Sequence, residues 1–233
     1  MDSDPGVVAG MPLAPLWIGT VEADELVVDP VDPLAAATGE EDRDAALRWL
    51  GAFQRAGTAE SRAWGGDEER AEMDEAVSFA WGEAVPERRV EALAAADRLA
   101  DPLRGLDVPV CPVHGDFWRG NIACTGDSIR VYDWEWATLT GRPFFDRWTY
   151  ELASLRHDPS DSIEALCDGL RTACRRVEEG LAEVGLDRRF ALATLAPVVA
   201  DLAFRVRRVR GQAPDNEQRA MQLVAAADRL LAA

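Results

Sequence analysis

Apolar residues in the C-terminal half of the chain recur at the spacing of one face of an α-helix. The clearest run occupies Ile163, Leu166, Cys167, Leu170, Cys174, Val177, Leu181 and Val184. Gly185 follows this run and predicts its end, because glycine readily adopts the left-handed conformation that closes a helix. The same period predicts a helix over 188–210 with a kink at Pro197. A last helix is expected to be capped by Asn216 and to end at Leu231.

Helical patterns also occupy much of the preceding chain. Thr38-Gly39-Glu40-Glu41 has the form of a capping box, in which a hydroxyl and a carboxylate satisfy the first free amides of a helix. We expect that helix to reach Arg55 and to bury Leu47, Leu50 and Phe53. Two further helices are expected over 67–81 and 86–100. The second of them should bury Val90, Leu93 and Leu99.

Shorter apolar runs, separated by turn residues, predict β-strands. Residues 16–21 and 25–28 form a hairpin pattern near the N-terminus. Residues 58–66 are small and turn-forming, so a loop is expected there. Residues 108–113 are apolar and predict a strand that leads into a polar loop.

A second hairpin follows that loop. Its expected strands, 121–124 and 128–132, flank the turn Thr125-Gly126-Asp127. Asn121 begins this hairpin and Asp133 follows its end. Antiparallel pairing therefore predicts that these two residues lie at the same end of the hairpin.

Polar residues around this hairpin form a pattern that suits phosphoryl transfer. His114-Gly115-Asp116 is followed, after four residues, by Asn121, and Asp133 and Glu135 come later. Phosphoryl transfer needs a carboxylate that receives the proton of the acceptor hydroxyl, and oxygen ligands that hold Mg²⁺ against the phosphates. Asp116 is the candidate catalytic carboxylate, and Asn121 and Asp133 are the candidate magnesium ligands. Glu135 lies two residues beyond Asp133, so it could bind a second metal ion or only support the loop.

Three motifs in this region occur in a fixed order. They read His-Gly-Asp-Phe-Trp-Arg-Gly-Asn-Ile at 114–122, Tyr-Asp-Trp-Glu-Trp-Ala at 132–137 and Gly-Arg-Pro-Phe-Phe-Asp at 141–146. Together they resemble the motifs of the aminoglycoside phosphotransferase and choline kinase family. That family has Gly where protein kinases usually have Arg after the His, and a motif of the Asp-Trp-Glu type in place of Asp-Phe-Gly. The resemblance implies a protein-kinase-like fold that uses ATP and Mg²⁺.

The resemblance also implies how the chain is divided. Residues 1–30 would be a remnant of the small lobe, made of a β-hairpin and a hinge. Residues 31–233 would be the helical C-terminal lobe, with the catalytic loop within 111–146. The hinge backbone would bind the adenine of ATP at Val27, Val28 and Asp29. A plain hairpin and linker is the alternative interpretation of that segment.

Two features of a complete kinase-like protein are missing from the sequence. The chain contains no lysine, and no Gly-rich phosphate-binding loop precedes residue 25. In the resembled family a lysine pairs with the α- and β-phosphates of ATP. We therefore expect either a truncated protein, or a small lobe that is degenerate or supplied by a partner chain.

Several nearby residues have an expected structural role. His114 is expected to brace the catalytic loop, as the equivalent position does in kinase-like folds. Asp146 is expected to cap a helix whose buried side is marked by Trp148, Leu152 and Leu155. Arg119 could steady the transferred phosphate, but pairing with a nearby acid is the favoured interpretation. Three tryptophans could line a substrate pocket, although core packing is expected for at least two of Trp118, Trp134 and Trp136.

Composition excludes some partners. Asp and Glu number 42 against 25 basic residues, so the net charge is −17. Such a surface repels nucleic acid and anionic lipid, and neither is an expected partner. All the basic residues are arginine, which fits either halophilic adaptation or GC-rich coding. No segment has the length of a membrane span and no signal sequence is evident, so a soluble, cytoplasmic protein is expected.

The four cysteines do not indicate a metal site. Cys111, Cys124, Cys167 and Cys174 form no C-x-x-C pair, and only two histidines are present. A zinc site is therefore not expected. Cys167 and Cys174 lie seven residues apart on one helix face, which favours core packing over a disulfide.

The sequence predicts an α+β fold: a kinase-like large lobe, mostly helical, with a short catalytic β-hairpin and a remnant of the small-lobe sheet. The predicted function is transfer of the ATP γ-phosphoryl group to a hydroxyl of a small molecule, such as an aminoglycoside, choline or a sugar. The first alternative is a kinase-like binding or regulatory module without catalysis. A metal-dependent phosphohydrolase, with water as acceptor, is a weaker alternative.

Overall fold

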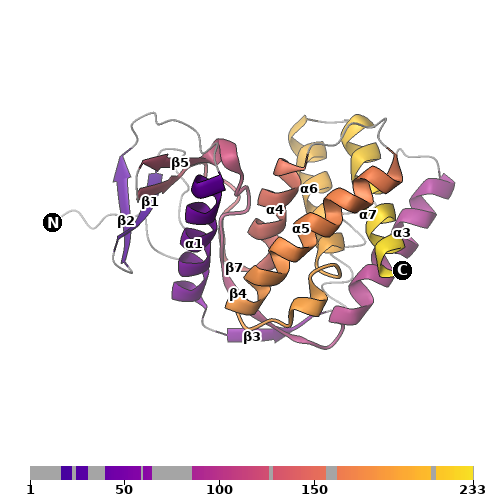
Figure 1. The fold of residues 1–233 in the computed structure, drawn as a ribbon, viewed down its shortest axis with the longest axis horizontal. Helices are drawn as coiled ribbons and strands as arrows, with labels where there is room; N and C mark the ends of the chain where they lie inside the picture. The colour runs from indigo at the N-terminus through magenta and orange to yellow at the C-terminus, as the bar shows by residue number, and fades with distance from the viewer. Residues whose placement is uncertain are drawn as a thin grey trace. The chain divides into compact units, whose positions relative to one another are not determined.

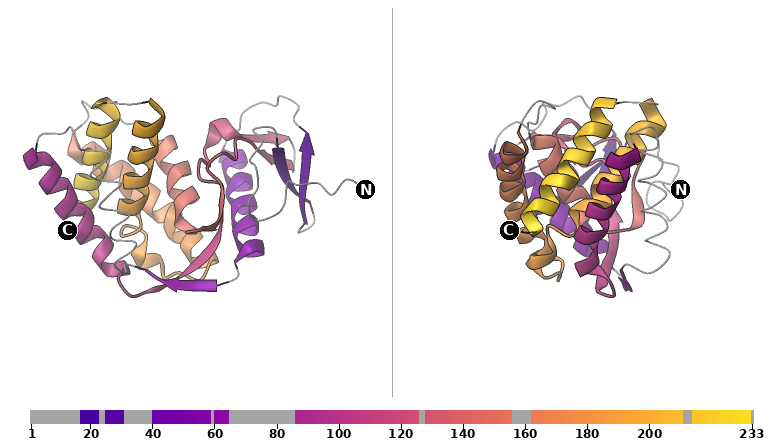
Figure 2. Two further views of the ribbon diagram at one scale, coloured as in Figure 1. Left: turned by 180° about the vertical axis from the view of Figure 1, so that it is seen from behind. Right: turned by 90° about the vertical axis from the view of Figure 1, so that its right-hand side faces the viewer.

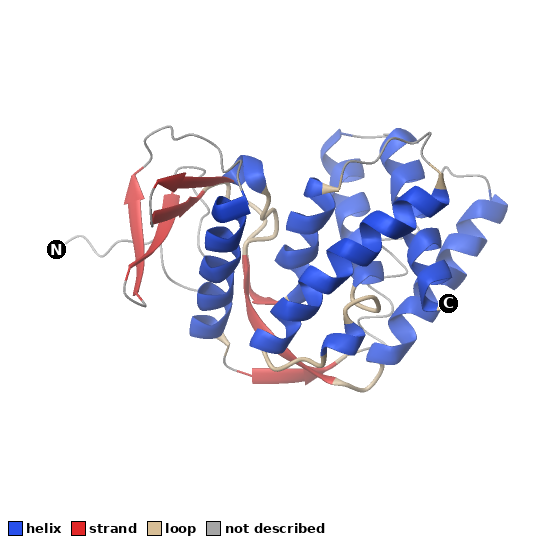
Figure 3. Cartoon of the chain, in the orientation of Figure 1, coloured by secondary structure: helices blue, strands red, loops and turns tan. Residues whose placement is uncertain are grey.

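The structure is a computed structural model that describes residues 17–22, 25–30, 40–58, 60–64, 86–125, 128–155, 162–210 and 214–232. It is mostly helical, with two small sheets whose assigned pairings are antiparallel (Figure 3). The chain forms two compact units that are interleaved in sequence. The first unit comprises Met1–Ser61, Pro109–Ser154 and Glu183–Gly185, and the second comprises Arg62–Val108, Leu155–Ala182 and Leu186–Ala233.

A four-stranded antiparallel sheet belongs to the first unit. Its strands are β1 (Trp17–Glu22), β2 (Glu25–Pro30), β5 (Ile122–Thr125) and β6 (Ser128–Val131), in the order β2-β1-β6-β5. Both predicted hairpins are therefore confirmed. The structure adds that they share one sheet, because β1 pairs with β6 where Gly19 lies opposite Val131.

The helix α1 (Glu40–Gly57) stands beside this sheet (Figure 1). Its predicted extent is confirmed, and it ends two residues beyond Arg55. Leu50 is fully buried, while Leu47 and Phe53 are partly buried and pack against the same cluster. That cluster joins α1, the candidate catalytic loop, the second hairpin and Tyr150. Its buried members are Ala46, Trp49, Leu50, Phe117, Ile122, Ile129, Val131 and Tyr150. Burial of this apolar set fixes the hairpin against the helix.

A second sheet contains β3 (Glu60–Ala63), β4 (Asp107–Val113) and β7 (Thr138–Gly141), in the order β3-β4-β7. The expected strand at 108–113 is confirmed as β4. The loop expected over 58–66 is wrong, because β3 lies within it, and β7 was not expected. All four residues of β3 are exposed, so this edge strand carries no alternation of apolar and polar residues. Backbone pairing alone makes it a strand.

The helix α4 (Phe144–Ser154) completes the first unit. It begins two residues before Asp146, so the expectation that Asp146 caps this helix is wrong. Pro143 immediately precedes the helix, and the side-chain amide of Gln54 donates to the Pro143 carbonyl over 2.9 Å. Three charged residues of α4 are buried, namely Asp146, Arg147 and Glu151. Each has a partner on another element, as buried charges require.

Helices form most of the second unit. They are α3 (Pro86–Ala100), α5 (Ile163–Glu183), α6 (Leu195–Arg210) and α7 (Pro214–Leu231). Short 3₁₀ turns occur at Asp101–Leu103 (η2) and Arg188–Phe190 (η4). The helices α3, α6 and α7 lie side by side (Figure 2). Arg98 of α3 binds Asp228 of α7 through two hydrogen bonds of 2.7 and 2.9 Å.

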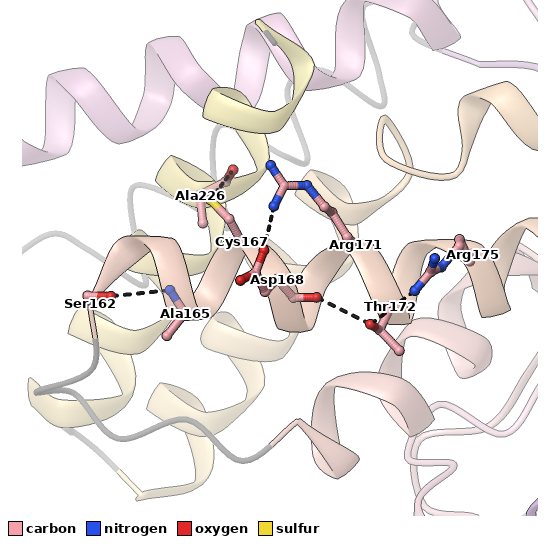
Figure 4. Close-up of polar contacts among 8 residues, drawn as sticks. All are labelled: Ser162, Ala165, Cys167, Asp168, Arg171, Thr172, Arg175 and Ala226. Carbon is pink, nitrogen blue, oxygen red and sulfur yellow. Dashed lines mark hydrogen bonds and ion pairs between the residues drawn. The ribbon is translucent and has the colours of Figure 1, made fainter.

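The predicted period of α5 is confirmed. Ser162 precedes the helix and its hydroxyl accepts from the Ala165 amide over 3.2 Å, as in an N-cap (Figure 4). Cys167 is buried against α7, and its thiol donates to the Ala226 carbonyl over 3.6 Å. Gly185 has a φ of +80°, in agreement with its expected role after the helix. All four cysteines of the chain are free thiols.

Other expectations in the second unit need correction. Val90 is 63% exposed and does not face the core, whereas Leu99 is fully buried. The helix expected over 188–210 begins at Leu195, so Pro197 lies in its first turn, where proline is tolerated and causes no kink. The last helix begins at Pro214, so Asn216 does not cap it. The helix expected over 67–81 lies outside the described residues, as do Thr38 and Gly39 of the capping box.

Candidate active site

The candidate catalytic loop leaves β4 through a sharp turn at Gly115. Gly115 has a φ of +84°, in the left-handed region that favours glycine. A Cβ atom at this position would collide with the carbonyl oxygen of Trp136. Two features therefore require glycine at this position of the motif. They are its left-handed backbone conformation and the close approach of the Asp-Trp-Glu segment.

The Asp146 carboxylate stabilises this turn through two hydrogen bonds. Its Oδ2 accepts from the His114 amide over 2.7 Å, and its Oδ1 accepts from the Gly115 amide over 2.8 Å. The carboxylate is fully buried, so these charge-assisted bonds act in a low-dielectric surrounding. The geometry gives Asp146 a supporting role, although by a different contact from the helix cap that was expected.

His114 joins the loop to the end of the hairpin. Its Nε2 lies 2.6 Å from the Tyr132 carbonyl oxygen, and its Nδ1 accepts from the Asp116 amide over 3.2 Å. The donor and acceptor roles agree if Nε2 carries the proton. The ring is fully buried and packs edge-on against Trp134, with ring centroids 4.7 Å apart. Both ring nitrogens are thus used in structural contacts, which suits a brace and not a base.

Asn121 lies in direct contact with Asp116. The Asn121 side-chain amide nitrogen donates to the Asp116 carbonyl oxygen and to the Asp116 Oδ2, each over 2.9 Å. The intervening residues form a 3₁₀ turn, η3 (Arg119–Asn121), in which the Asn121 amide donates to the Trp118 carbonyl. These bonds orient the Asp116 carboxylate. They also commit the nitrogen of the Asn121 side chain, so that its carbonyl oxygen is the atom suited to a cation.

The hairpin brings Asp133 to the same end as Asn121. The Tyr132 amide donates to the Asn121 carbonyl over 2.8 Å, next to the β5–β6 pair Ile122–Val131. Asp133 follows directly and has a φ of +60°, which no other non-glycine residue of the described segments shares. Such a conformation costs about 1 kcal/mol or more, and it is often found at functional sites. The predicted convergence of the loop and the hairpin end is therefore present in the backbone.

The electrostatics around Asp133 suit a cation. Burial raises the pKa of the Asp133 carboxyl, and the negative charge of Glu135 raises it further. A carboxylate in this position is less stable than one in water, and a bound cation would relieve both penalties. Glu135 itself is exposed. An anionic oxygen from Asp133 and a neutral oxygen from Asn121 are ligands that Mg²⁺ accepts.

No group of three or more His, Cys, Asp or Glu side chains within the described segments could hold a metal ion. A magnesium site for a nucleotide does not need one. Mg²⁺ commonly binds one or two carboxylates together with substrate phosphates and water. The residues therefore fit the ion, while its binding stays a prediction.

The three tryptophans of the region differ in their surroundings. Trp134 is partly buried and packs edge-on against Trp49 and Phe53 of α1, with ring centroids 6.1 and 5.4 Å away. Its indole nitrogen donates to the Val131 carbonyl over 2.9 Å. Trp136 is half-buried against Gly115. Trp118 is 42% exposed and its ring rests on Gly120, so it is the one of the three that presents an aromatic face to solvent.

A cluster of charged and hydroxyl groups beside the loop could not be recognised in the sequence. The Tyr150 hydroxyl lies near the guanidinium of Arg119, and the Tyr150 ring packs on Phe117. Burial raises the pKa of Tyr150, while the Arg119 guanidinium opposes that shift. Arg43 of α1 binds the buried Glu151 over 2.8 Å. These four residues come from three separate elements, and nothing in their local spacing relates them.

The candidate hinge residues lie on β2. Val27, Val28 and Asp29 pair with Thr20, Gly19 and Ile18 of β1. The strand β2 is one of the two edge strands of its sheet as described. Adenine binding by this segment stays a prediction.

Comparison with known proteins identifies a family for this chain. The sequence profile of the phosphotransferase enzyme family matches residues 14–162, well over half of the chain. The chain therefore belongs to this phosphotransferase family, which includes aminoglycoside phosphotransferases and choline kinase-like proteins. The family match thus places the chain in the phosphotransferase class.

Other comparisons are more distant. None of the curated proteins matches the chain significantly. A solved structure of glucosamine kinase (crystal form B) is similar, with 20% sequence identity and a TM-score of 0.43. That similarity covers 80% of this chain and 50% of the glucosamine kinase, so the chain spans half the length of that protein. In the described part of the chain, no helix is both long and apolar enough to cross a membrane.

Proposed function

We propose that this chain transfers the γ-phosphoryl group of ATP to a hydroxyl group of a small molecule. Membership of the phosphotransferase family supports the reaction class. The observation that carries the proposal is the contact between Asn121 and Asp116, beside a hairpin end that presents Asp133. This arrangement provides one carboxylate for the acceptor and a separate pair of oxygen ligands for a cation.

The reaction assigns one chemical step to Asp116. The acceptor oxygen attacks the γ-phosphorus while its proton moves to the Asp116 carboxylate. The bond between the γ-phosphorus and the bridging oxygen breaks, and ADP leaves with the electron pair. Asp116 is suited to this role because the Asn121 amide fixes one of its oxygens and the loop is braced through Asp146.

Asn121 and Asp133 would hold Mg²⁺ in this proposal. The ion, when bound, neutralises charge on the phosphates of ATP. Glu135 would either bind a second ion or support the loop. The Asp133 backbone, held at positive φ, aims its carboxylate away from the direction that a regular strand would give.

The proposal extends to the division of the chain. The first hairpin and the candidate hinge would represent the small lobe, and the helical remainder would represent the large lobe. A partner chain could supply further small-lobe contacts to the nucleotide. The acceptor would be a hydroxyl-bearing small molecule of the aminoglycoside, choline or sugar type.

A second candidate function is a kinase-like binding or regulatory module without catalysis. The observation that favours it is the absence of lysine from these 233 residues, since lysine usually pairs with the α- and β-phosphates. Heat stability with and without Mg²⁺ and ATP, measured beside turnover, separates the two functions. A rise in melting temperature without turnover for any acceptor would favour the second.

The test of the first function is the Asp116→Asn variant. Turnover, followed as ADP formation with a panel of aminoglycosides, choline and sugars, should fall by about 10²–10⁴-fold. The asparagine keeps an oxygen that can accept from Asn121, so the melting temperature should change little. The matched control is Asp168→Asn, which alters an exposed carboxylate paired only with Arg171 among the described residues. Undiminished turnover in Asp116→Asn would refute the assignment.

A further inference from the structure

The Glu183 carboxylate binds a buried arginine, Arg147, which follows Asp146 directly in α4. The Arg147 guanidinium donates to the Glu183 Oε2 over 2.6 Å. The Arg147 side chain is 4% exposed, and Glu183 is the one carboxylate among the described residues with which it forms an ion pair. Glu183 ends α5 and belongs to the first unit, as Arg147 does. A buried guanidinium of α4 therefore depends on a single carboxylate from another helix.

The same carboxylate is also in contact with α1. Arg55 of α1 lies 3.7 Å from the Glu183 Oε2. A Cβ atom at Gly51 would lie 2.6 Å from that oxygen, so the glycine gives the carboxylate room to approach α1. The Arg55 side chain is 53% exposed and can be hydrated without Glu183, whereas the buried Arg147 cannot. The two arginines therefore differ in how strongly they need the same oxygen atom.

Arg147 is linked to the candidate catalytic loop through its neighbour in sequence. Asp146 and Arg147 both lie in the first turn of α4, and the Asp146 carboxylate accepts from the His114 and Gly115 amides. If Glu183 lost its charge, Arg147 would become a buried cation without a counter-ion, which is strongly unfavourable. The guanidinium would then move toward water, and the first turn of α4 would move with it. Asp146 would no longer hold the loop in its present position.

Asn121 is held by the hairpin. Its carbonyl oxygen accepts from the Tyr132 amide over 2.8 Å, next to the first pair of β5 and β6. A displaced turn at His114 and Gly115 would therefore move Asp116 and leave the candidate magnesium ligands in place. The expected consequence is a slower reaction step without weaker binding of the nucleotide.

We propose that Glu183 is a positioning residue of the phosphotransfer site, which acts through Arg147 and Asp146 on the Asp116 carboxylate. This inference rests on the proposed phosphotransferase function and deepens it. Glu183 contacts neither substrate nor metal ion and exchanges no proton during the reaction. Its charge keeps the buried guanidinium paired, and the paired guanidinium keeps the first turn of α4 under the loop.

The Glu183→Gln variant tests this inference, because it removes the charge and preserves the shape of the side chain. The assay uses ATP with whichever aminoglycoside, choline or sugar the unaltered chain phosphorylates fastest. We expect kcat to fall by about tenfold or more, since a small misplacement of a catalytic group is costly, while KM for ATP stays within about twofold. Hydrogen exchange of the His114 and Gly115 amides should become faster. A role in stability alone would lower the melting temperature and leave kcat unchanged below it.

A double variant and a matched control identify the cause. Glu183→Gln combined with Arg147→Met leaves no unpaired charge in the interior, so kcat should return to within about threefold of the unaltered value. The control is Arg55→Met, which removes the exposed arginine from the same Glu183 oxygen. It should keep kcat and the exchange rates of the two loop amides.

The possible outcomes separate this inference from the proposed function. Full kcat in Glu183→Gln, or unchanged exchange of the two amides, would overturn the inference and leave the proposed function standing. The same holds if the double variant is as slow as Glu183→Gln, or if Arg55→Met is equally slow. No turnover of any acceptor by the unaltered chain would overturn the proposed function, and the inference with it.

Discussion

Two residues of the candidate site have left-handed backbone conformations. Gly115, with a φ of +84°, begins the catalytic loop, and Asp133, with a φ of +60°, ends the hairpin. The first is a residue for which this conformation has little cost, and the second is of a type that tolerates it. Among the described residues, the one non-glycine residue with positive φ is thus the one whose side chain is predicted to bind a cation.

The Gly115→Ala substitution tests this arrangement at the residue scale. Alanine at this φ costs about 1–2 kcal/mol by itself, and its Cβ would also collide with the Trp136 carbonyl. We expect the free energy of unfolding to fall by about 3 kcal/mol or more, as measured in urea.

Gly185→Ala is the matched control, because Gly185 belongs to the same unit, has a φ of +80° and has open space around its Cα. It should lose only the conformational part, about 1–2 kcal/mol. Equal losses in the two variants would show that Trp136 does not approach Gly115 as closely as the structure indicates.

At the scale of elements, α4 supports the catalytic loop from a distance in sequence. Asp146 lies in its first turn and accepts two backbone amides of the loop, while Arg147 binds Glu183 at the end of α5. Burial lowers the pKa of Arg147, and Glu183 opposes that shift. The helix therefore positions the loop by polar contacts, and α1 does so by apolar contacts through Trp49 and Phe117, whose rings stack with centroids 5.9 Å apart.

The Asp146→Asn substitution tests the contact between α4 and the loop. An amide can accept only one of the two bonds, and its NH₂ group would face a backbone N–H. We expect a loss of about 2–3 kcal/mol in the free energy of unfolding. Hydrogen exchange of the His114 and Gly115 amides should become faster.

Thr149→Val is a control within the same helix. The Thr149 hydroxyl donates only to the Phe145 carbonyl one turn earlier, so its loss should cost about 1 kcal/mol or less. Unchanged exchange of the two loop amides in Asp146→Asn would contradict the bracing role of α4.

At the scale of the whole molecule, the two units are built from alternating segments of one chain. The chain passes between them at several points, so neither unit corresponds to a continuous stretch of sequence. Unfolding of one unit would free the points at which the chain enters and leaves the other unit. We therefore expect one cooperative transition, as is usual for small proteins of this kind.

The reactivity of two cysteine thiols, one in each unit, shows whether the two units unfold together. Burial raises the pKa of Cys111 in the first unit to about 12, and that of Cys174 in the second unit to about 11, from an ordinary value of 9.0. The thiols therefore stay protonated in the folded chain at pH 9, whereas unfolding lets them ionise and react. Since the folded pKa is the higher one, stability should also decrease as the pH rises from about 9 toward 11.

Alkylation by iodoacetamide at pH 9, followed residue by residue by mass spectrometry across a urea series, should label Cys111 and Cys174 over the same range of urea. Labelling at clearly separate urea concentrations would show that the two units unfold independently. Rapid labelling of Cys111 without urea would contradict its burial.

Much of the local structure could be predicted from the sequence, because it depends on neighbouring residues. The period of α5 and the two hairpins follow from side-chain alternation and turn chemistry, which act over a few residues. The spacing of His114, Asp116 and Asn121 likewise indicated the chemistry, since a short loop can present those side chains together. Weakly patterned elements were missed: the exposed strand β3 and the short strand β7 exist through backbone pairing with β4.

By itself, the sequence determined the helices, the hairpins and the candidate chemistry of this protein, since each of these is encoded over a short distance along the chain. Only the tertiary structure decided which distant groups meet: the Asp146 carboxylate at the His114 amide, the Trp136 carbonyl against Gly115, and the Arg43 guanidinium at the Glu151 carboxylate. These contacts join elements that are far apart in sequence. They form because burial of the shared apolar cluster brings α1, α4 and the hairpin together. Local residue patterns do not predict which elements pack against one another in this way.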